Sequence, residues 1–219
     1  MISKEKFLNI LSILKELYPD AKTELNYHNG FELIIAVVLS AQTTDKQVNK
    51  VTPALFKRFS NPEMLGSASI IEVEKLISSI GLFHNKSKNI IKLAQIVHEQ
   101  YHDEIPSKKE ELLKLPGVGE KTANVVMGDY FKIPALAVDT HVERLAKRWN
   151  VVSPKANVAE VQKQLMKMTP KSEWVVTHHR LILFGRYFCT SRSPKCTECK
   201  ILPYCKFGKE RLKINDSQH

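Results

Sequence analysis

The spacing of the apolar residues is the feature that most constrains this chain, because it is helical along nearly the whole sequence. Apolar side chains recur at steps of three and four over residues 7–17, which predicts an amphipathic helix that ends before Pro19. Residues 31–39 are apolar and partly β-branched, so they could form a strand on local preference. Helical segments flank them and no partner strand is evident, so we predict a buried helix there.

Cap signals predict where further helices begin. Three residue pairs have capping-box spacing, and one asparagine precedes a proline suited to a first helical turn: Thr44 with Gln47, Ser69 with Glu72, Ser107 with Glu110, and Asn61 before Pro62. They predict helices of about ten to fifteen residues, one of which runs through Ile80 and is closed by Gly81. Periodicity predicts helices over about residues 86–101, 140–149, 158–168 and 174–188. No alternating segment lies between hairpin turns, so the fold class is all-α.

Charge and hydropathy narrow the functional classes. Among 219 residues, 33 are Lys or Arg and 23 are Asp or Glu, a net charge of +10 that makes nucleic acid a candidate partner. No apolar run approaches the roughly 20 residues that cross a bilayer. The first residues carry charges throughout and lack the apolar core of a signal peptide. We therefore expect no membrane span and a cytoplasmic location.

A glycine-containing turn is the first motif that points to chemistry. Residues 115–123 read LPGVGEKTA, which predicts a short helix ending at Lys114, a turn through Gly117, Val118 and Gly119, and a new helix from about Glu120. Backbone N–H groups at such a helix start bind phosphate, and phosphate contacts position a duplex without reading its sequence. An isolated Pro-Gly-x-Gly is more often an ordinary corner between helices.

Two ionisable residues near this turn suggest a reaction. Lys121 lies at the start of the second helix, where its amine could reach the sugar beside a bound phosphate and act as a nucleophile if its neutral form is favoured. Asp139 precedes a helical pattern and suits an N-cap, which alone would explain it. Held near Lys121, the same carboxylate could accept a proton or stabilise positive charge on a sugar.

All four cysteines lie close together near the C-terminus: Cys189, Cys196, Cys199 and Cys205, separated by six, two and five residues. Such crowding argues for a metal rather than a disulfide framework. Four thiolates suit structural zinc or an iron–sulfur cluster, and this spacing matches the usual pattern of neither. Within the first interval, Arg192 and Lys195 would project from a metal-held loop and offer cations to DNA phosphate.

Together these motifs resemble the endonuclease III family of DNA glycosylases over nearly the whole chain. The resemblance is carried by LPGVGEKTANVV, AVDTHVERLAKR, SAQTTD at residues 40–45, Ile80-Gly81-Leu82 and the cysteine spacing. It implies two helical domains with a DNA cleft between them. Residues 23–134 would form a six-helix domain with a helix-hairpin-helix at 115–125, and residues 1–22 plus 135–219 a domain holding one 4Fe–4S cluster on the four cysteines.

The resemblance also implies a mechanism. Lys121 would attack C1′ of a damaged nucleotide with help from Asp139, expel the base as a Schiff base forms, and allow β-elimination to nick the strand. The target nucleotide must first leave the stack, and side chains matching Gln42 and Leu82 would fill the gap and wedge the opposite strand. Asp45 matches a pocket residue of the family, although it could equally stabilise a helix start.

The remaining implications concern substrate and partners. His141 also matches a pocket position that contacts DNA. The expected substrate is duplex DNA that contains oxidised pyrimidines, such as thymine glycol, or abasic sites, and the protein is expected to act as a monomer. Glu120 departs from the family pattern, because many relatives carry a basic residue there, and a carboxylate would weaken phosphate attraction.

Other functions stay open at this point. Adenine glycosylases of the same superfamily usually lack the lysine and carry a further C-terminal domain. A thymine or uracil glycosylase specific for mismatches would differ in pocket shape, which the motifs do not reveal. A non-catalytic DNA-binding module is disfavoured by the pairing of Lys121 with Asp139, and a small electron-transfer protein leaves the hairpin unexplained. The leading hypothesis is a bifunctional glycosylase and lyase of base excision repair.

Overall fold

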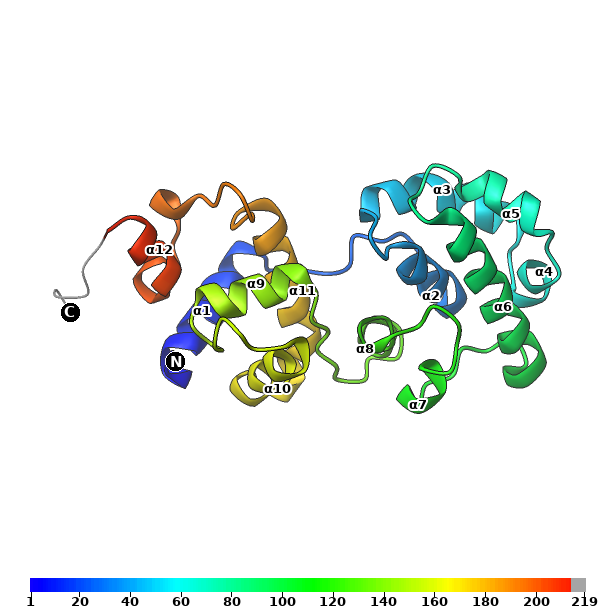
Figure 1. The fold of residues 1–219 in the computed structure, drawn as a ribbon. Helices are drawn as coiled ribbons and strands as arrows, with labels where there is room; N and C mark the ends of the chain where they lie inside the picture. The colour runs from blue at the N-terminus through cyan, green and yellow to red at the C-terminus, as the bar shows by residue number, and fades with distance from the viewer. Residues whose placement is uncertain (214–219) are drawn as a thin grey trace. The chain divides into compact units, whose positions relative to one another are not determined.

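The computed structural model describes residues 1–213, which form helices joined by turns and loops, with no strand in that range (Figure 1). The prediction of an all-α fold is confirmed. The α-helices are α1 Lys4–Leu17, α2 Gly30–Leu39, α3 Asp45–Arg58, α4 Pro62–Gly66, α5 Ile70–Ile77, α6 Phe83–Tyr101, α7 Lys109–Leu112, α8 Glu120–Asp129, α9 Thr140–Arg148, α10 Val158–Met168, α11 Trp174–Tyr187 and α12 Lys206–Arg211. Three short 3₁₀ helices cover Lys171–Glu173, Cys196–Glu198 and Leu202–Tyr204. Over the same residues, no helix combines the length and apolarity needed to span a membrane.

The chain divides into two compact units. Residues 23–133 form the first, which we call the hairpin unit. Residues 1–22 and 134–213 form the second, which we call the cysteine unit. The first helix of the sequence thus packs with the C-terminal half of the chain.

The hairpin unit is built around α2. Every residue of this helix except Glu32 is buried, and α2 contacts α3, α6 and α8. The helix starts at Asn29, whose side-chain Oδ1 accepts a hydrogen bond from the backbone N–H of Glu32 at 2.9 Å. Burial on all sides outweighs the local strand preference of its β-branched residues, so the predicted buried helix is confirmed. The long helix α6 packs against α4 and α5 (Figure 1).

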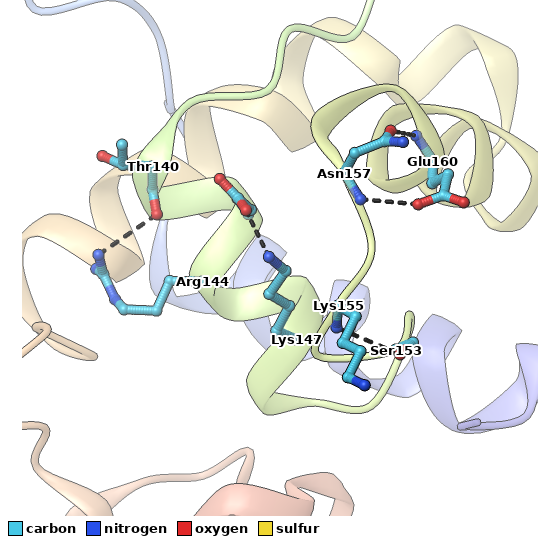
Figure 2. Close-up of polar contacts among 8 residues, drawn as sticks. Thr140, Arg144, Lys147, Ser153, Lys155, Asn157 and Glu160 are labelled. Carbon is cyan, nitrogen blue, oxygen red and sulfur yellow. Dashed lines mark hydrogen bonds and ion pairs between the residues drawn. The ribbon is translucent and has the colours of Figure 1, made fainter.

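In the cysteine unit, α1 packs on α10 and α11, and α9 on α10, α11 and α12. Its core includes Phe7 and Leu14 of α1 together with Trp149 and Phe184, whose ring centroids are 5.9 Å apart. Figure 2 shows the capping box that begins α10, in which Asn157 Oδ1 accepts from the N–H of Glu160 and Glu160 Oε2 from that of Asn157, at 3.0 and 2.8 Å. The expected helix over residues 158–168 agrees with α10, although this capping box was not among the signals used.

The predicted caps were only partly right. Asn61 caps α4, and Thr44 Oγ1 accepts from the N–H of Gln47 at 3.2 Å. The pair is not a reciprocal capping box, however, because the amide of Gln47 donates to the hydroxyl of Ser79 instead, at 3.0 Å. A partner supplied by another segment therefore replaces the local one.

At the other two pairs no capping box forms, although α5 begins after Ser69 as predicted and α7 begins only one residue later than Ser107 predicts. Ser69 stands at the N-cap of α5 without a side-chain capping bond, and Glu72 pairs with Arg58 of α3. The N-cap of α7 is Lys108 rather than Ser107, and it too makes no side-chain cap bond. At the starts of α5 and α7, the favourable spacing of the two residues therefore does not lead to a hydrogen bond between side chain and helix start.

Helix lengths also differ from the prediction. Three of the helices predicted from cap signals, α4, α5 and α7, have only five, eight and four residues, and α7 ends at Leu112 rather than Lys114. Helix α5 ends at Ile77 rather than Ile80, so Gly81 does not close it, and α6 begins at Phe83, three residues earlier than expected. The residue with left-handed backbone is Leu82, with φ 59°. The short helices pack on longer neighbours. This packing stabilises helices that would be too short to be stable alone.

Candidate active site and cysteine cluster

The hairpin between α7 and α8 requires glycine at its first glycine position. Gly117 has φ +78°, and a Cβ there would lie 3.0 Å from Cγ1 of Val38 and 3.3 Å from the side chain of Asn89. The N–H of Val118 donates to the carbonyl of Leu115 at 3.1 Å and closes the turn. Backbone conformation and close packing therefore both fix Gly117.

Gly119 differs from Gly117, because nothing within the hairpin unit demands a glycine there. Its φ is −100°, and a Cβ would meet no atom within 4 Å. Gly119 is nevertheless the N-cap of α8 and has no side chain with which to satisfy the first N–H groups of that helix. The start of α8 thus presents backbone donors to open space, the arrangement that binds an anion.

Lys121 is the second residue of α8 and its side chain is exposed. The neighbouring Glu120 pairs with Lys109 of α7, with Nζ and Oε2 2.6 Å apart. This pair joins the two helices of the hairpin and offsets the carboxylate that departs from the family pattern. No sequence pattern indicated a role for Lys109, because its partner Glu120 lies on the other side of the turn and no local spacing relates the two.

Asp139 is the N-cap of α9, as predicted. Its Oδ1 accepts hydrogen bonds from the N–H groups of His141 and Val142, both at 2.9 Å. The two bonds fix the half-buried carboxylate and leave its second oxygen for another partner. Lys121 belongs to the hairpin unit and Asp139 to the cysteine unit, so their cooperation stays a prediction.

His141 lies in the first turn of α9, where its Nδ1 is 3.1 Å from Nη2 of Arg144. Arginine can only donate, so this contact requires an unprotonated Nδ1. The same Nη2 donates to the carbonyl of Gly185 at 2.7 Å, and Nη1 to that of Thr140 at 3.5 Å (Figure 2). Arg144 therefore orients His141 and links α9 to α11.

Gln42 and Leu82 share an uncommon backbone conformation. Their φ values are 55° and 59°, and both side chains are exposed, Leu82 to 56%. Left-handed backbone costs a non-glycine residue about 1–2 kcal/mol and tends to persist where function requires it. Asp45 occupies the first turn of α3, a position that also suits simple stabilisation of the helix start.

The four cysteines line one cavity in the cysteine unit. Its other walls are largely apolar and aromatic, and they include Trp149, Phe184, Phe188, Leu202 and Phe207. Within residues 1–213, no three Cys, His, Asp or Glu side chains are arranged as a site for a single metal ion. Burial raises the pKa of Cys189 and Cys199, and raises that of Cys205 to about 11.

Hydrogen-bond donors already point at two of the sulfur atoms. Nη1 of Arg148 lies 3.0 Å from Sγ of Cys189, and the N–H of Gly208 donates to Sγ of Cys205 at 3.3 Å. N–H donors and apolar walls are what surround sulfur ligands of iron–sulfur clusters. The donor set of three buried cysteines and the half-buried Cys199, with these contacts, therefore fits such a cluster.

Arg148 also holds the loop that follows Cys189. Its guanidinium donates to the carbonyls of Cys189, Thr190 and Ser191 at 3.1, 2.8 and 2.9 Å and lies 4.3 Å from the ring centroid of Phe207. From sequence, Arg148 was only one basic residue at a helix end. The loop carries Arg192 and Lys195 with exposed side chains, as expected for phosphate contacts.

Comparisons with known proteins agree on a family. Residues 35–171 match the model of the HhH-GPD superfamily of base excision DNA repair proteins. The chain is 48% identical to endonuclease III of Bacillus subtilis (strain 168), over 97% of each chain. It is 43% identical to endonuclease III of Escherichia coli (strain K12), over 97% of this chain and 100% of the relative.

Solved structures give the same result. A non-covalent endonuclease III–DNA complex and a trapped covalent endonuclease III–DNA intermediate each match with a TM-score of 0.94 and 48% identity. Both matches cover 97% of this chain and 100% of the solved chain. The resemblance inferred from the motifs is thereby confirmed, and this chain belongs to the endonuclease III family within the HhH-GPD superfamily.

Proposed function

We propose that this protein is a bifunctional DNA glycosylase and abasic-site lyase of base excision repair. The observation that carries the proposal is the position of Lys121, exposed on the second residue of a helix whose uncapped start suits a DNA phosphate. Covalent trapping of an endonuclease III on DNA, in a relative 48% identical to this chain, supports a covalent mechanism.

The reaction begins when the neutral amine of Lys121 attacks C1′ of the damaged nucleotide. The bond from C1′ to the base breaks, and the base leaves with its electron pair and takes up a proton. The bond from C1′ to the ring oxygen O4′ then breaks as C1′ and the lysine nitrogen form a protonated Schiff base, and O4′ takes up a proton, so that the sugar ring opens. Loss of a proton from C2′ then expels the 3′ phosphate, and water releases the amine.

The other site residues bind and stabilise. The hairpin at residues 117–119 and the first N–H groups of α8 hold a phosphate, while the N–H of Val118 stays bonded to Leu115 within the turn. Asp139 accepts the proton of the ammonium or stabilises charge on the sugar. Gln42 fills the space of the extruded nucleotide and Leu82 wedges the opposite strand. Asp45 and His141 each contact the extruded nucleotide.

The substrate is duplex DNA with an oxidised pyrimidine such as thymine glycol, or with an abasic site. A damaged, non-planar base stacks poorly and costs less to extrude. The protein acts as a monomer in the cytoplasm, associated with the chromosome through DNA. The hairpin unit is the helix-hairpin-helix domain and the cysteine unit is the iron–sulfur domain.

Cys189, Cys196, Cys199 and Cys205 hold one 4Fe–4S cluster. When bound, the cluster supplies a rigid, thiolate-ligated centre that shapes the DNA-binding loop and takes no part in the excision step. Arg148 orients that loop, and Arg192 and Lys195 on it contact DNA phosphates. The iron assignment predicts a brown protein that absorbs broadly near 400 nm, and a colourless protein with stoichiometric zinc would contradict it.

Borohydride trapping on a duplex with one thymine glycol tests the proposal. The parent protein should form a covalent complex with DNA, whereas Lys121→Gln should form none and should release no base. Lys92→Gln, which changes an exposed lysine of α6, is the matched control and should trap as the parent does. Base release without trapping would instead indicate a glycosylase that uses water, and no reaction by the parent would contradict the proposed substrate.

A further inference from the structure

Lys86 is a buried lysine for which the proposed reaction has no role. It lies in the first half of α6 with only 4% of its surface exposed, and Nζ donates to Oγ1 of Thr43 at 2.9 Å. Burial lowers its pKa. Enclosing an ammonium costs free energy that an apolar side chain would not, so stability alone gives no reason for a lysine here.

The hydrogen bond from Lys86 joins two segments that carry DNA-contacting residues. Thr43 directly follows Gln42, and its N–H donates to the carbonyl of Ser40 at 3.1 Å, which closes the turn around Gln42. The backbone N–H of Lys86 donates to the carbonyl of Leu82 at 3.0 Å. One lysine thus contacts both the turn that holds Gln42 and the residue Leu82.

A second hydrogen bond joins the same two segments. The amide of Gln47 donates to Oγ of Ser79 at 3.0 Å, so residues 40–47 and 79–86 are linked at two points. Gln42 and Leu82 both have left-handed backbone and exposed side chains. Such conformations persist only where the surrounding contacts fix them.

The same helix also supports the hairpin. Asn89 follows Lys86 by three residues, which places the two on neighbouring positions of one face of α6. The side chain of Asn89 lies 3.3 Å from the point that a Cβ of Gly117 would occupy. Leu82, Lys86 and Asn89 therefore connect the start of α6, the Gln42 turn and the phosphate-binding hairpin, all within the hairpin unit.

We infer that Lys86 is a positioning residue for nucleotide extrusion, which fixes the Gln42 turn relative to Leu82 so that both side chains enter the duplex together. The inference rests on the proposed function. A preorganised pair of inserting side chains avoids the entropy of ordering a loop during binding. Lys86 itself touches neither the sugar nor the scissile bond.

The test measures extrusion rather than chemistry. Each variant is made in the Lys121→Gln background and mixed with a thymine glycol duplex that carries 2-aminopurine beside the lesion, whose fluorescence rises when stacking is lost. Lys86→Met and Thr43→Val should each lower the fluorescence rise and weaken affinity for the damaged duplex by about 10- to 100-fold. Affinity for undamaged DNA should stay within about twofold, because phosphate contacts supply it.

Three further measurements make the role specific. The double variant should lose no more than either single variant, because both remove the same contact. Thr43→Ser keeps the hydroxyl and should retain the signal, and Lys92→Met is the control for loss of a lysine on α6. Lys86→Met should unfold at the same temperature as its background protein or higher, which separates lost positioning from lost stability.

Full fluorescence with Lys86→Met and with Thr43→Val would overturn the inference, as would losses that simply add. If Lys86→Met fails to fold, the comparison of Thr43→Val with Thr43→Ser decides alone. Failure of the unmodified protein to form the borohydride-trapped complex with thymine glycol DNA would overturn the proposed function and this inference with it. Normal trapping by that protein, with no effect of the Lys86 and Thr43 variants, would overturn the inference only.

Discussion

The starts of α8 and α9 solve the same structural problem in opposite ways. Each helix follows a turn and leaves N–H groups without an intrahelical partner. At α9 the chain satisfies them itself, because Asp139 Oδ1 accepts from two of them. At α8 the N-cap is Gly119, which has no side chain to offer and borders open space.

The difference shows how one local geometry serves two purposes. The open start of α8 is free to bind an external anion, and the helix dipole favours that anion. The closed start of α9 uses the same attraction to fix a carboxylate in one orientation. In the proposed reaction, α8 holds the substrate and α9 holds the residue that assists Lys121.

The largest effect should come from removing the charge at α9 while keeping its cap. Asparagine caps helices as well as aspartate does, so Asp139→Asn should change the free energy of unfolding by less than about 1 kcal/mol. Base excision should fall by about 10²- to 10⁴-fold, because the proton acceptor is gone. Single-turnover excision and urea unfolding measure the two effects. If excision by Asp139→Asn equals that of the parent, Asp139 is a cap and nothing more.

Closing the start of α8 in the manner of α9 is the converse experiment. Gly119→Asp should fold normally, since its backbone suits an N-cap and a Cβ meets no neighbour. Its carboxylate would occupy the phosphate position and weaken DNA binding by about tenfold or more. Gly119→Asn supplies a cap without charge and should weaken binding less. Equal affinity of Gly119→Asp and the parent in a fluorescence anisotropy titration would rule out a phosphate at this helix start.

The first glycine of the hairpin should respond differently from the second. Gly117→Ala places a Cβ 3.0 Å from Val38 in left-handed backbone. We expect it to lower the free energy of unfolding by about 1–3 kcal/mol, whereas Gly119→Ala should have almost no effect on folding. Urea titrations of both variants check this, and equal stability of the two would contradict the left-handed backbone and close packing at Gly117.

Lys195→Ala extends the comparison to the cysteine loop. Lys195 is exposed beside Phe188, with Nζ 6.0 Å from the ring centroid. If it contacts one phosphate, its loss should weaken binding alike for all DNA sequences and reduce the slope of log Kd against log salt by about 0.9. An unchanged slope would exclude that contact.

Sequence patterns predicted those parts of the fold that depend on burial along one helix. The helix over residues 158–168 followed from periodicity, and the helix over residues 31–39 followed from its helical flanks and the lack of a partner strand. They agree with α10 and α2 within one residue. Capping boxes do not form where a side chain bonds to a residue of another segment, as Gln47 does to Ser79 and Glu72 to Arg58. The spacing of residues along the chain shows which local hydrogen bonds are possible. It does not show which of them are replaced by bonds to distant segments in the folded protein.

The same limit applies to the site. The roles that the motifs suggest for Lys121, Asp139 and the cysteines stay predictions, whereas the contacts of Arg148 and Lys86 lie with segments far along the chain, which no local motif reveals. For Lys86 a signal was present, since it shares the helical register of the buried residues Ile90, Leu93 and Val97. The predicted helix began at about residue 86, which placed Lys86 in its first turn. With the observed start at Phe83, it is a charged residue on an apolar face, which calls for a functional explanation.

Glu120 should give the smallest effect and the finest test of the open helix start. Its carboxylate lies one residue from Lys121 and pairs with Lys109 at 2.6 Å, yet Glu120 is 63% exposed, so solvent screens much of its charge. Glu120→Gln removes a repulsive charge near the phosphate and releases Lys109. We expect DNA binding to tighten by about two- to fivefold at low salt, with the gain vanishing as salt rises. Lys109→Gln, which leaves the carboxylate unpaired, should weaken binding instead. Salt titrations of DNA affinity for both variants would detect these opposite changes. A change of affinity in the same direction for both variants would mean that the pair does not act on the phosphate site through its charge.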